Sequence, residues 1–191
     1  MQLCFVTNNK NKLLEVSSIL EKELIINSLD DIGFSDQIPE TGKTIEDNSL
    51  EKAEFINKKF KLNCFADDTG LEIQSLNGNP GVHSARYAGI QCNANENINL
   101  VLKNMKDVSN RKASFRTIIT LILDSNFFFF EGKIDGKISY EPKGSYGFGY
   151  DPIFIPDGYN ITFGEMQPEK KNKISHRKKA INKLYLFLRK S

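Results

Sequence analysis

The sequence predicts an α/β protein that folds as one domain, and three observations support this prediction. Strand-like apolar runs alternate with helical patterns over the first third of the chain, in the order strand, helix, strand, helix, strand. A chain of 191 residues can bury a substantial core, so we expect a single domain over residues 1–191. Hydrophobic residues make up 39% and charged residues 26%, which is the composition of an ordinary globular protein.

The first elements follow from apolar spacing and from a helix-capping pattern. Residues 3–6 form a short apolar run that predicts a strand, and apolar positions at helical spacing in residues 13–20 predict a helix after it. Thr44, followed three residues later by Asp47, has the pattern of a helix N-cap. The helix that begins there is expected to run to about Phe60.

The middle of the chain continues this alternation. Strands are predicted at residues 64–67 and 71–73, with a turn between them. A helix is expected after Asn93, because apolar residues recur at helical spacing up to Met105.

The second half of the chain predicts a long hairpin and a final helix. Residues 113–123 and 127–134 are rich in β-branched and aromatic residues, and the Asp-Ser-Asn segment at 124–126 is typical of the turn between two strands. The four consecutive phenylalanines at 127–130 must point to both sides of a strand, so we expect both faces to be covered. Residues 175–190 predict a helix whose apolar stripe belongs to the core.

Composition and charge exclude several classes of protein. No apolar run approaches the roughly 20 residues of a membrane helix, and no signal-peptide pattern is present, so we expect a cytoplasmic protein. Cys4, Cys64 and Cys92 form no Cys-x-x-Cys pair, and we interpret all three as small core residues. The formal net charge of +2 is too balanced for a stable nucleic-acid partner.

The most informative motif is Asp67-Asp68-Thr69-Gly70, which directly follows an apolar run. Adjacent carboxylates at the end of a strand are suited to hold a hard cation and to position a water molecule. The same four residue types are also typical of a turn that caps a strand. The motif alone leaves both interpretations open.

A second motif predicts phosphate binding between the first strand and its helix. It consists of Thr7, Asn8, Asn9, Lys10, Asn11 and Lys12. Backbone N–H groups and the positive end of a helix dipole meet at such a loop, and Lys10 or Lys12 can add charge. The segment is not a Walker A loop, and a solvated helix start would fit the same residues.

A third motif is the glycine-rich segment 144–152, in which three glycines surround Phe148 and Tyr150. Glycines free the backbone, so that a flat ligand can stack on an aromatic ring. A glycine-rich loop alone does not identify the ligand.

Together with Ile174-Ser175-His176-Arg177, these motifs closely resemble the inosine triphosphate pyrophosphatase family of Ham1-type enzymes, in order and along nearly the whole chain. Segments 39–42, 48–53, 80–89 and 163–166 match this family as well. The resemblance implies an elongated α/β fold, in which a long central mixed sheet flanked by helices lies between two lobes. It also implies a homodimer.

The resemblance implies roles for the residues around the phosphates. Asp68 would be the proton acceptor and a ligand of Mg²⁺, and Glu40 and Asp67 would belong to the same metal site. Carboxylate and phosphate oxygens are the ligands that Mg²⁺ prefers. The implied phosphate contacts are Lys12, Lys52 and the hydroxyl of Thr69.

The resemblance also implies how the base is recognised. The implied base contacts are Phe148, Gly149, Tyr150, Asp151, Lys171, His176 and Arg177. Phe148 would stack on the purine, while His176 and Arg177 would donate to the six-oxo group, which hypoxanthine and xanthine carry and adenine lacks. The implied reaction is the Mg²⁺-dependent hydrolysis of ITP, dITP and XTP to the monophosphate and pyrophosphate.

Two other functions stay open at this point. A Maf-like pyrophosphatase acting on modified pyrimidine nucleotides is disfavoured by the Ser175-His176-Arg177 motif. A non-catalytic nucleotide- or RNA-binding module would leave Glu40, Asp67 and Asp68 without a purpose.

Overall fold

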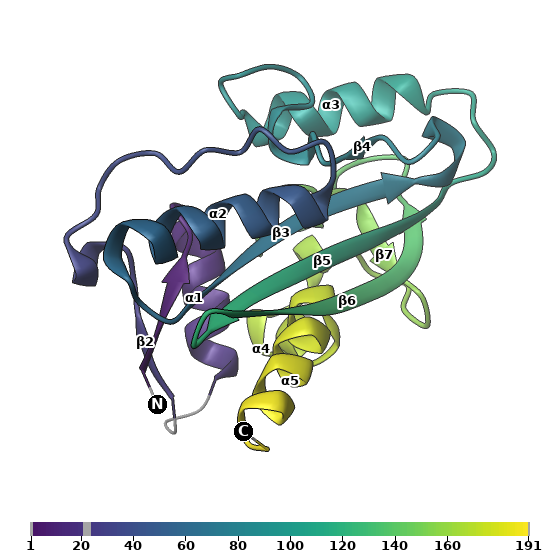
Figure 1. Ribbon diagram of the computed structural model, residues 1–191. Coiled ribbons are helices and arrows are strands. Elements are labelled where there is room, and N and C mark those ends of the chain that lie inside the picture. The colour runs from purple at the N-terminus through teal and green to yellow at the C-terminus, as the bar shows by residue number, and fades with distance from the viewer. Residues whose placement is uncertain (1, 21–23, 191) are drawn as a thin grey trace. The chain divides into compact units, whose positions relative to one another are not determined.

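The computed structural model, which describes residues 2–20 and 24–190, has the predicted α/β architecture (Figure 1). The strands are β1 (Gln2–Val6), β2 (Ile25–Asn27), β3 (Cys64–Ile73), β4 (Pro80–Gly81), β5 (Lys112–Leu123), β6 (Asn126–Ile138) and β7 (Phe154–Pro156). The helices are α1 (Lys10–Ile19), α2 (Ile45–Phe60), α3 (Ala94–Asn104), α4 (Pro168–Ile174) and α5 (His176–Leu188). Among the described residues, no helix is long and apolar enough to cross a membrane.

The seven strands form one mixed sheet, as expected. Their order is β2-β1-β3-β5-β6-β7, with β4 paired to β3 outside this path. β1 is parallel to both β2 and β3, whereas β4 is antiparallel to β3 and β7 is antiparallel to β6. Because Val6 pairs with Ala66, the loop after β1 lies beside the middle of β3, where Asp67 follows.

The chain is divided into two compact units, each built from separate segments. Unit 1 contains residues 1–68, 117–132 and 177–191, and unit 2 contains residues 69–116 and 133–176. The boundaries fall within β3, β5, β6 and α5, so each of these elements contributes residues to both units. The single domain expected over the chain stays a prediction.

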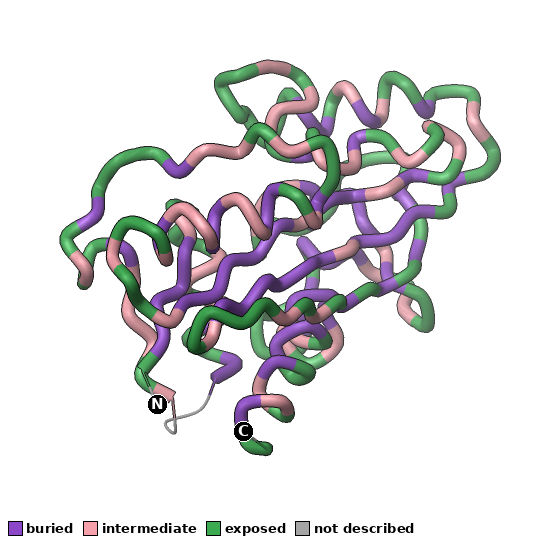
Figure 2. Tube along the Cα trace, in the orientation of Figure 1, coloured by how far each residue is buried: buried purple, intermediate pink, exposed green. Residues whose placement is uncertain are grey.

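In unit 1, side chains of β1 alternate between two hydrophobic clusters. Leu3 and Phe5 pack with residues of α1 and α5, whereas Cys4 and Val6 pack with residues of α2. This alternation follows because successive side chains of a strand point to opposite faces. Phe5 also stacks on Phe65 of β3, with ring centroids 4.7 Å apart. The central strands are therefore covered on both faces, and Figure 2 shows them as buried.

Helix α2 begins and ends where the sequence predicts. The Thr44 hydroxyl accepts a hydrogen bond from the Asp47 N–H, and the Asp47 carboxylate accepts one from the Thr44 N–H. This capping box satisfies two backbone donors at the start of the helix. Ala53 and Ile56 are fully buried against the sheet, which fixes the rotation of the helix about its axis.

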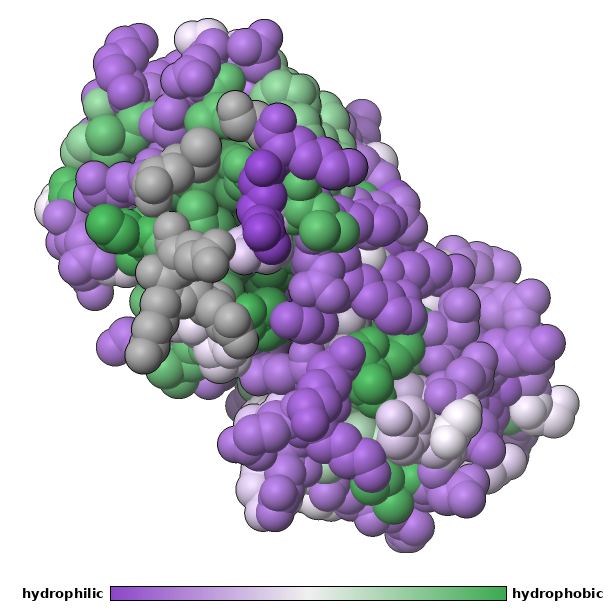
Figure 3. All heavy atoms as spheres, turned by 90° about the horizontal axis from the view of Figure 1, so that it is seen from below, coloured by the Kyte–Doolittle hydropathy of each residue, from purple (hydrophilic) through white to green (hydrophobic). Residues whose placement is uncertain are grey.

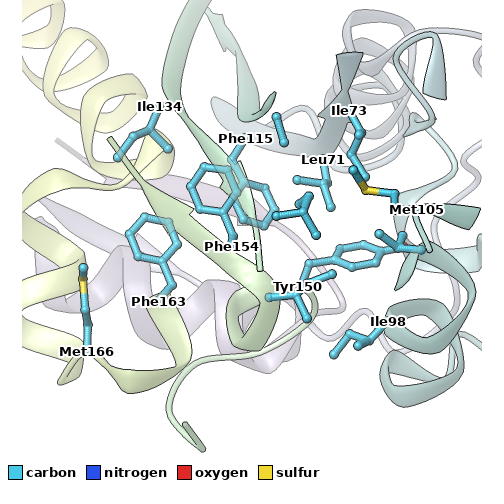
Figure 4. Packing of buried hydrophobic residues seen from close by; sticks show 14 residues of the cluster. Leu71, Ile73, Ile98, Met105, Phe115, Ile134, Tyr150, Phe154, Phe163 and Met166 are labelled. Atoms are coloured by element: carbon cyan, nitrogen blue, oxygen red, sulfur yellow. The ribbon is translucent and has the colours of Figure 1, made fainter. Parts of the chain in front are cut away.

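The core of unit 2 is rich in aromatic rings. Phe115 of β5 lies 4.7 Å from Phe154 of β7 between ring centroids, and Phe163 packs against both (Figure 4). Ile98 of α3 belongs to the same cluster. Arg111 is also buried here and donates to three backbone carbonyl groups, so its charge is stabilised by dipoles.

The predicted hairpin joins β5 to β6 through a two-residue turn. Asp124 and Ser125 have φ angles of 49° and 67°, the left-handed conformation that such a turn requires. Asn126, expected in the turn, is instead the first residue of β6. The side chain of Asn63 exchanges hydrogen bonds with Asp124 at 3.0 and 2.9 Å, which holds the tip of the hairpin.

The phenylalanine run is covered on one face, not on both as expected. Phe128 and Phe130 pack against Phe187 of α5, with ring centroids 4.4 and 5.5 Å away. Phe127 and Phe129 are 47% and 53% exposed. Among the described residues, the cluster that packs against α2 contains strand residues of β1, β3 and β5 but none of β6, so this helix does not cover Phe127 and Phe129. Hydrophobic side chains reach the surface elsewhere too, as the green areas of Figure 3 show.

Two further expectations are corrected by the structure. The turn predicted between residues 67 and 71 is not formed, because β3 continues as one strand through this motif. Cys4 and Cys64 are buried as predicted, and burial raises their pKa values to about 11 and about 12. Cys92 is exposed, so its interpretation as a core residue is wrong.

Candidate active site

Unit 1 contains a buried cluster of acidic and basic side chains centred on β3. Asp67 and Asp68 are 1% and 8% exposed, and they point to opposite faces because they follow each other in a strand. Thr69 comes next, is half-buried and belongs to unit 2. A buried carboxylate is stable only where cations or hydrogen-bond donors compensate its charge. Each of the two aspartates has its own set of such partners.

Asp67 is held between α1 and α5. The Lys12 ammonium lies 3.0 Å from its Oδ1 atom, and the Arg177 Nε donates to its Oδ2 atom at 3.1 Å. Arg177 also pairs through Nη1 with Glu15 of α1. Burial alone would raise the pKa of Asp67, but the charges of Lys12, Arg177 and Lys52 hold it well below its usual value. Asp67 is therefore an ionised structural anchor.

Asp67 and Arg177 pair with each other, and their expected roles as metal ligand and base contact stay predictions. The two carboxylate oxygens of Asp67 face Lys12 and Arg177. The Arg177 Nε and Nη1 groups donate to carboxylates, and its side chain is only 1% exposed. Both residues belong to the charge cluster of unit 1.

Asp68 is held by two donors of α2. The Lys52 ammonium lies 3.2 Å from Asp68 Oδ1 and 2.5 Å from Glu40 Oε1. The Asn48 amide donates to Asp68 Oδ2 at 3.2 Å. Burial lowers the pKa of Lys52, but the charges of Asp68, Glu40 and Asp67 outweigh this effect and raise it. Lys52 thus stays charged between two carboxylates, and it is not the solvated surface residue that lysine usually is.

The donor set of Glu40 and Asp68 fits a magnesium ion. Both carboxylates point to one cationic group, the Lys52 ammonium. Mg²⁺ is usually bound by one or two carboxylates, with substrate phosphates and water as its other ligands. Over residues 2–20 and 24–190, no three His, Cys, Asp or Glu side chains gather as they would in a cage made of protein alone. The site therefore suits a metal that arrives with a phosphorylated ligand.

The loop after β1 has the predicted strand–loop–helix geometry. Thr7 Oγ1 accepts from the Asn9 N–H at 3.1 Å, and Asn9 Oδ1 accepts from the N–H groups of Asn11 and Lys12 at 3.0 and 3.2 Å. Asn9 thereby caps α1 and uses two of the N–H groups that we expected to face a phosphate. The ammonium groups of Lys10 and Lys12 can also attract a phosphate at this loop, and that of Lys12 pairs with Asp67 as well.

Asn8 connects this loop to a distant segment. Its Nδ2 donates to the Asp36 carbonyl at 3.2 Å, and its Oδ1 accepts from the Ile38 N–H at 3.4 Å. The segment it holds leads directly to Glu40. Lys10 is exposed at the first position of α1. Sequence reasoning did not find the Asn8 contact, because its partners are 28 and 30 positions away.

Unit 2 contains a second cluster, built around Asp151. The Lys171 ammonium lies 2.6 Å from Asp151 Oδ2, and the Phe148 N–H donates to the same oxygen at 2.8 Å. The ammonium is also 4.9 Å from the centroid of the Phe148 ring. Gly147 has φ +75°, and a Cβ atom there would lie 2.0 Å from Asp151 Oδ2. The loop therefore closes on Asp151 only with glycine at this position, and it leaves Phe148 half-exposed.

The other residues expected near the base are placed in the same unit. His176 is buried, and its ring stacks on Phe115 at 4.7 Å between centroids. The Tyr150 hydroxyl donates to the Ser84 carbonyl at 2.8 Å, and burial raises the pKa of this tyrosine. Tyr150 is thus part of the core. Gly149, with φ +61°, has open space around the position of a Cβ atom.

Unit 1 thus carries buried carboxylates and ammonium groups of the kind that bind phosphates and metals, and unit 2 carries an aromatic ring on a loop fixed by an ion pair, which suits a flat ligand. The chain belongs to the Ham1 family, whose sequence model matches residues 3–187.

Individual relatives agree with this assignment. A dITP/XTP pyrophosphatase of Porphyromonas gingivalis is 53% identical over 188 residues, which cover 98% of this chain and 97% of that protein. A dITP/XTP pyrophosphatase of Bacillus subtilis is 44% identical, with 95% and 94% of the two chains covered. The solved structure of a HAM1 protein from Coxiella burnetii has a TM-score of 0.91 at 36% identity and covers both chains completely, at 100% each.

Proposed function

We propose that this protein hydrolyses the non-standard purine nucleoside triphosphates ITP, dITP and XTP to the monophosphate and pyrophosphate, and so removes them from the nucleotide pool. The observation that carries this proposal is the Asp68 carboxylate, held by Lys52 and Asn48 next to Glu40 in a Ham1-family chain. Relatives that cover nearly the whole chain are named dITP/XTP pyrophosphatases. This match favours the proposed reaction over that of a Maf-like pyrophosphatase.

The phosphate end of the reaction is assigned to unit 1. Asp68 accepts the proton of a water molecule whose oxygen attacks the α-phosphorus, while the bond to the β-phosphate breaks and pyrophosphate leaves. The ammonium groups of Lys12 and Lys52 compensate the charge of the phosphates. Glu40 and Asp68 would hold Mg²⁺, which would supply further neutralisation of the phosphoryl oxygens.

The base end is assigned to unit 2. The half-exposed ring of Phe148 stacks on the purine, and the Asp151–Lys171 pair holds the loop that carries this ring. A six-oxo purine offers an acceptor to protein donors such as Lys171 and His176. Adenine presents an amino group there, which leaves a buried donor unpaired at a cost of about 1–3 kcal/mol.

We also infer that the protein acts in the cytoplasm, where its proposed substrates arise, and that it works as a homodimer. The resemblance to Ham1-type enzymes supports both inferences. No membrane or stable nucleic-acid partner is proposed.

Pyrophosphate release from a panel of triphosphates tests the function. ITP, dITP, XTP, GTP, ATP and modified pyrimidine triphosphates are compared with Mg²⁺ present, and Asp68→Asn serves as the inactive control. We expect the highest kcat/KM values for ITP, dITP and XTP. A preference for modified pyrimidines would favour the Maf-like alternative, and no release from any triphosphate would indicate a binding module.

A further inference from the structure

Asn48 lies on α2 between Asp68 and the loop that carries Glu40. Its side chain is almost completely buried, and both ends of its amide are engaged. Nδ2 donates to Asp68 Oδ2 at 3.2 Å, and Oδ1 accepts from the Gly42 N–H at 2.8 Å. One short side chain thus connects the proposed proton acceptor with the backbone two residues after a proposed metal ligand.

The direction of the Asn48 amide is dictated by its two neighbours. The Gly42 N–H can only donate, so the amide oxygen must face it. With the amide oxygen on Gly42, the amide nitrogen faces Asp68 Oδ2 and donates to it. A flipped amide would lose both hydrogen bonds, because its nitrogen would face the Gly42 N–H and its oxygen would face the Asp68 carboxylate. The donor directed at Asp68 is therefore a fixed feature of the fold.

Helical spacing makes this donor one of a pair. Asn48 and Lys52 are four residues apart, so they lie on the same face of α2. Each places its donor 3.2 Å from a different oxygen of Asp68. Lys52 is long, flexible and shared with Glu40, whereas Asn48 has only two side-chain torsions. Asn48 is thus the more rigid of the two restraints on the carboxylate plane.

The loop that carries Glu40 is fitted closely to Asn48. A Cβ atom at Gly42 would lie 2.8 Å from Asn48 Oδ1 and 2.5 Å from Asp47 Cβ, so only glycine allows this approach. A second restraint comes from Glu51, whose carboxylate accepts from the Thr41 N–H at 2.6 Å and the Thr41 hydroxyl at 2.7 Å. The loop is therefore held to α2 at two successive residues, Thr41 and Gly42.

We propose that Asn48 is a positioning residue, which fixes the orientation of the Asp68 carboxylate for proton transfer. The proposal rests on the proposed function. Residues that orient catalytic or metal-binding groups in this way typically change activity by 10–100-fold when they are removed. Orientation of a proton acceptor acts on the chemical step, so kcat falls and binding of the triphosphate does not change.

Three variants separate positioning from a purely structural role. Asn48→Ala removes both hydrogen bonds, whereas Asn48→Asp keeps an acceptor for Gly42 but replaces the donor to Asp68. Ser49→Ala is the matched control, because Ser49 is the next residue on α2 and equally buried, yet its hydroxyl contacts the Ala66 carbonyl and Thr120. For each variant, kcat for ITP, the thermal midpoint and the calorimetric affinity for Mg²⁺ with α,β-methylene-ITP are measured.

We expect both Asn48 variants to lower kcat by about 10–100-fold. For Asn48→Ala, the affinity for the methylene analogue should stay within about threefold of the parent value, and the thermal midpoint should resemble that of Ser49→Ala. Asn48→Asp places a second buried carboxylate beside Asp68, so its thermal midpoint should be lower. If Asn48 acts through Asp68, a double-mutant cycle gives the sharpest test. Asn48→Ala should then have almost no further effect on kcat in the Asp68→Asn background.

Three results would overturn the positioning role. They are a kcat of either Asn48 variant close to that of Ser49→Ala, a loss of analogue affinity as large as the loss of kcat, and additive effects in the double-mutant cycle. All three presuppose an active parent protein. A parent that releases no pyrophosphate from any triphosphate would refute the proposed function instead, so the two failures can be distinguished.

Discussion

Replacing Asp67 by asparagine should destabilise the protein strongly although it barely changes the volume of the side chain. The substitution removes the charge that faces Lys12 at 3.0 Å and Arg177 at 3.1 Å. Removal of one partner from a buried ion pair costs about 3–5 kcal/mol. Glu15 still compensates Arg177, and Lys12 is 13% exposed, so we expect the lower end of this range.

The size of this effect and its dependence on pH can both be measured. About 3 kcal/mol corresponds to a fall of about 6–12 °C in the thermal midpoint of a chain of this size. The folded-state pKa of Asp67 is lowered, so its stabilisation is complete above the unfolded value of about 4 and is lost as the pH falls through the folded value. The gap between parent and Asp67→Asn should therefore stay constant from about pH 8 to pH 5, and narrow only below about pH 4.

Thermal and urea denaturation of both proteins across this pH range provide the assay. Glu54→Gln is a suitable control, because it removes an ion pair with Lys58 on the outer side of α2, where the cost should stay below about 0.5 kcal/mol. The reasoning is refuted if Asp67→Asn costs no more than this control. A gap that already closes between pH 7 and pH 5 would mean that another group carries the effect.

Three further predictions concern activity. Asp68→Asn should lower kcat by roughly 10²–10⁴-fold with little change in the thermal midpoint, and near-normal turnover at saturating Mg²⁺ would contradict its role as proton acceptor. EDTA should abolish pyrophosphate release without changing the far-ultraviolet circular dichroism, and Mg²⁺ should restore it; full activity after exhaustive chelation would argue against a metal at Glu40 and Asp68. Phe148→Ala should weaken the binding of ITP by roughly 1–3 kcal/mol, because stacking on the purine is lost, and should leave inhibition by inorganic triphosphate unchanged. Lys12→Ala should weaken both the binding of ITP and the inhibition by inorganic triphosphate. The opposite pattern in inhibition assays would show that the base and phosphate ends are assigned wrongly.

Features that depend on near neighbours in the sequence were predicted well. The Thr44 cap of α2 and the hairpin turn at Asp124 and Ser125 are examples, because the residues that define them lie within four positions of one another. The order of the first five elements was predicted for the same reason, since each has its own apolar spacing. Helix α4, which is only seven residues long, has too short a pattern and was missed.

Features that depend on distant partners were not predictable from local patterns. Asp67 and Asp68 look equivalent in the sequence, and only the continuation of β3 shows that they face opposite sides. Arg177 reaches Asp67 across 110 positions, so local sequence patterns could not predict that these two residues form a pair. The exposure of Phe127 and Phe129 likewise depends on which strands the helices cover.

The segmented construction of unit 1 has a consequence for synthesis on the ribosome. Helix α5 is translated after all the other elements of this unit, yet it supplies Ala180, Ile181 and Leu184 to the cluster that covers Leu3 and Phe5. Helix α5 also carries Arg177, which pairs with Asp67. Both are translated more than a hundred codons after the start of unit 1. A nascent chain stalled before α5 therefore displays an apolar sheet face, which chaperones recognise, and its Asp67 has Lys12 but not yet Arg177 as a partner. Completion of unit 1 must accordingly wait until α5 has left the exit tunnel.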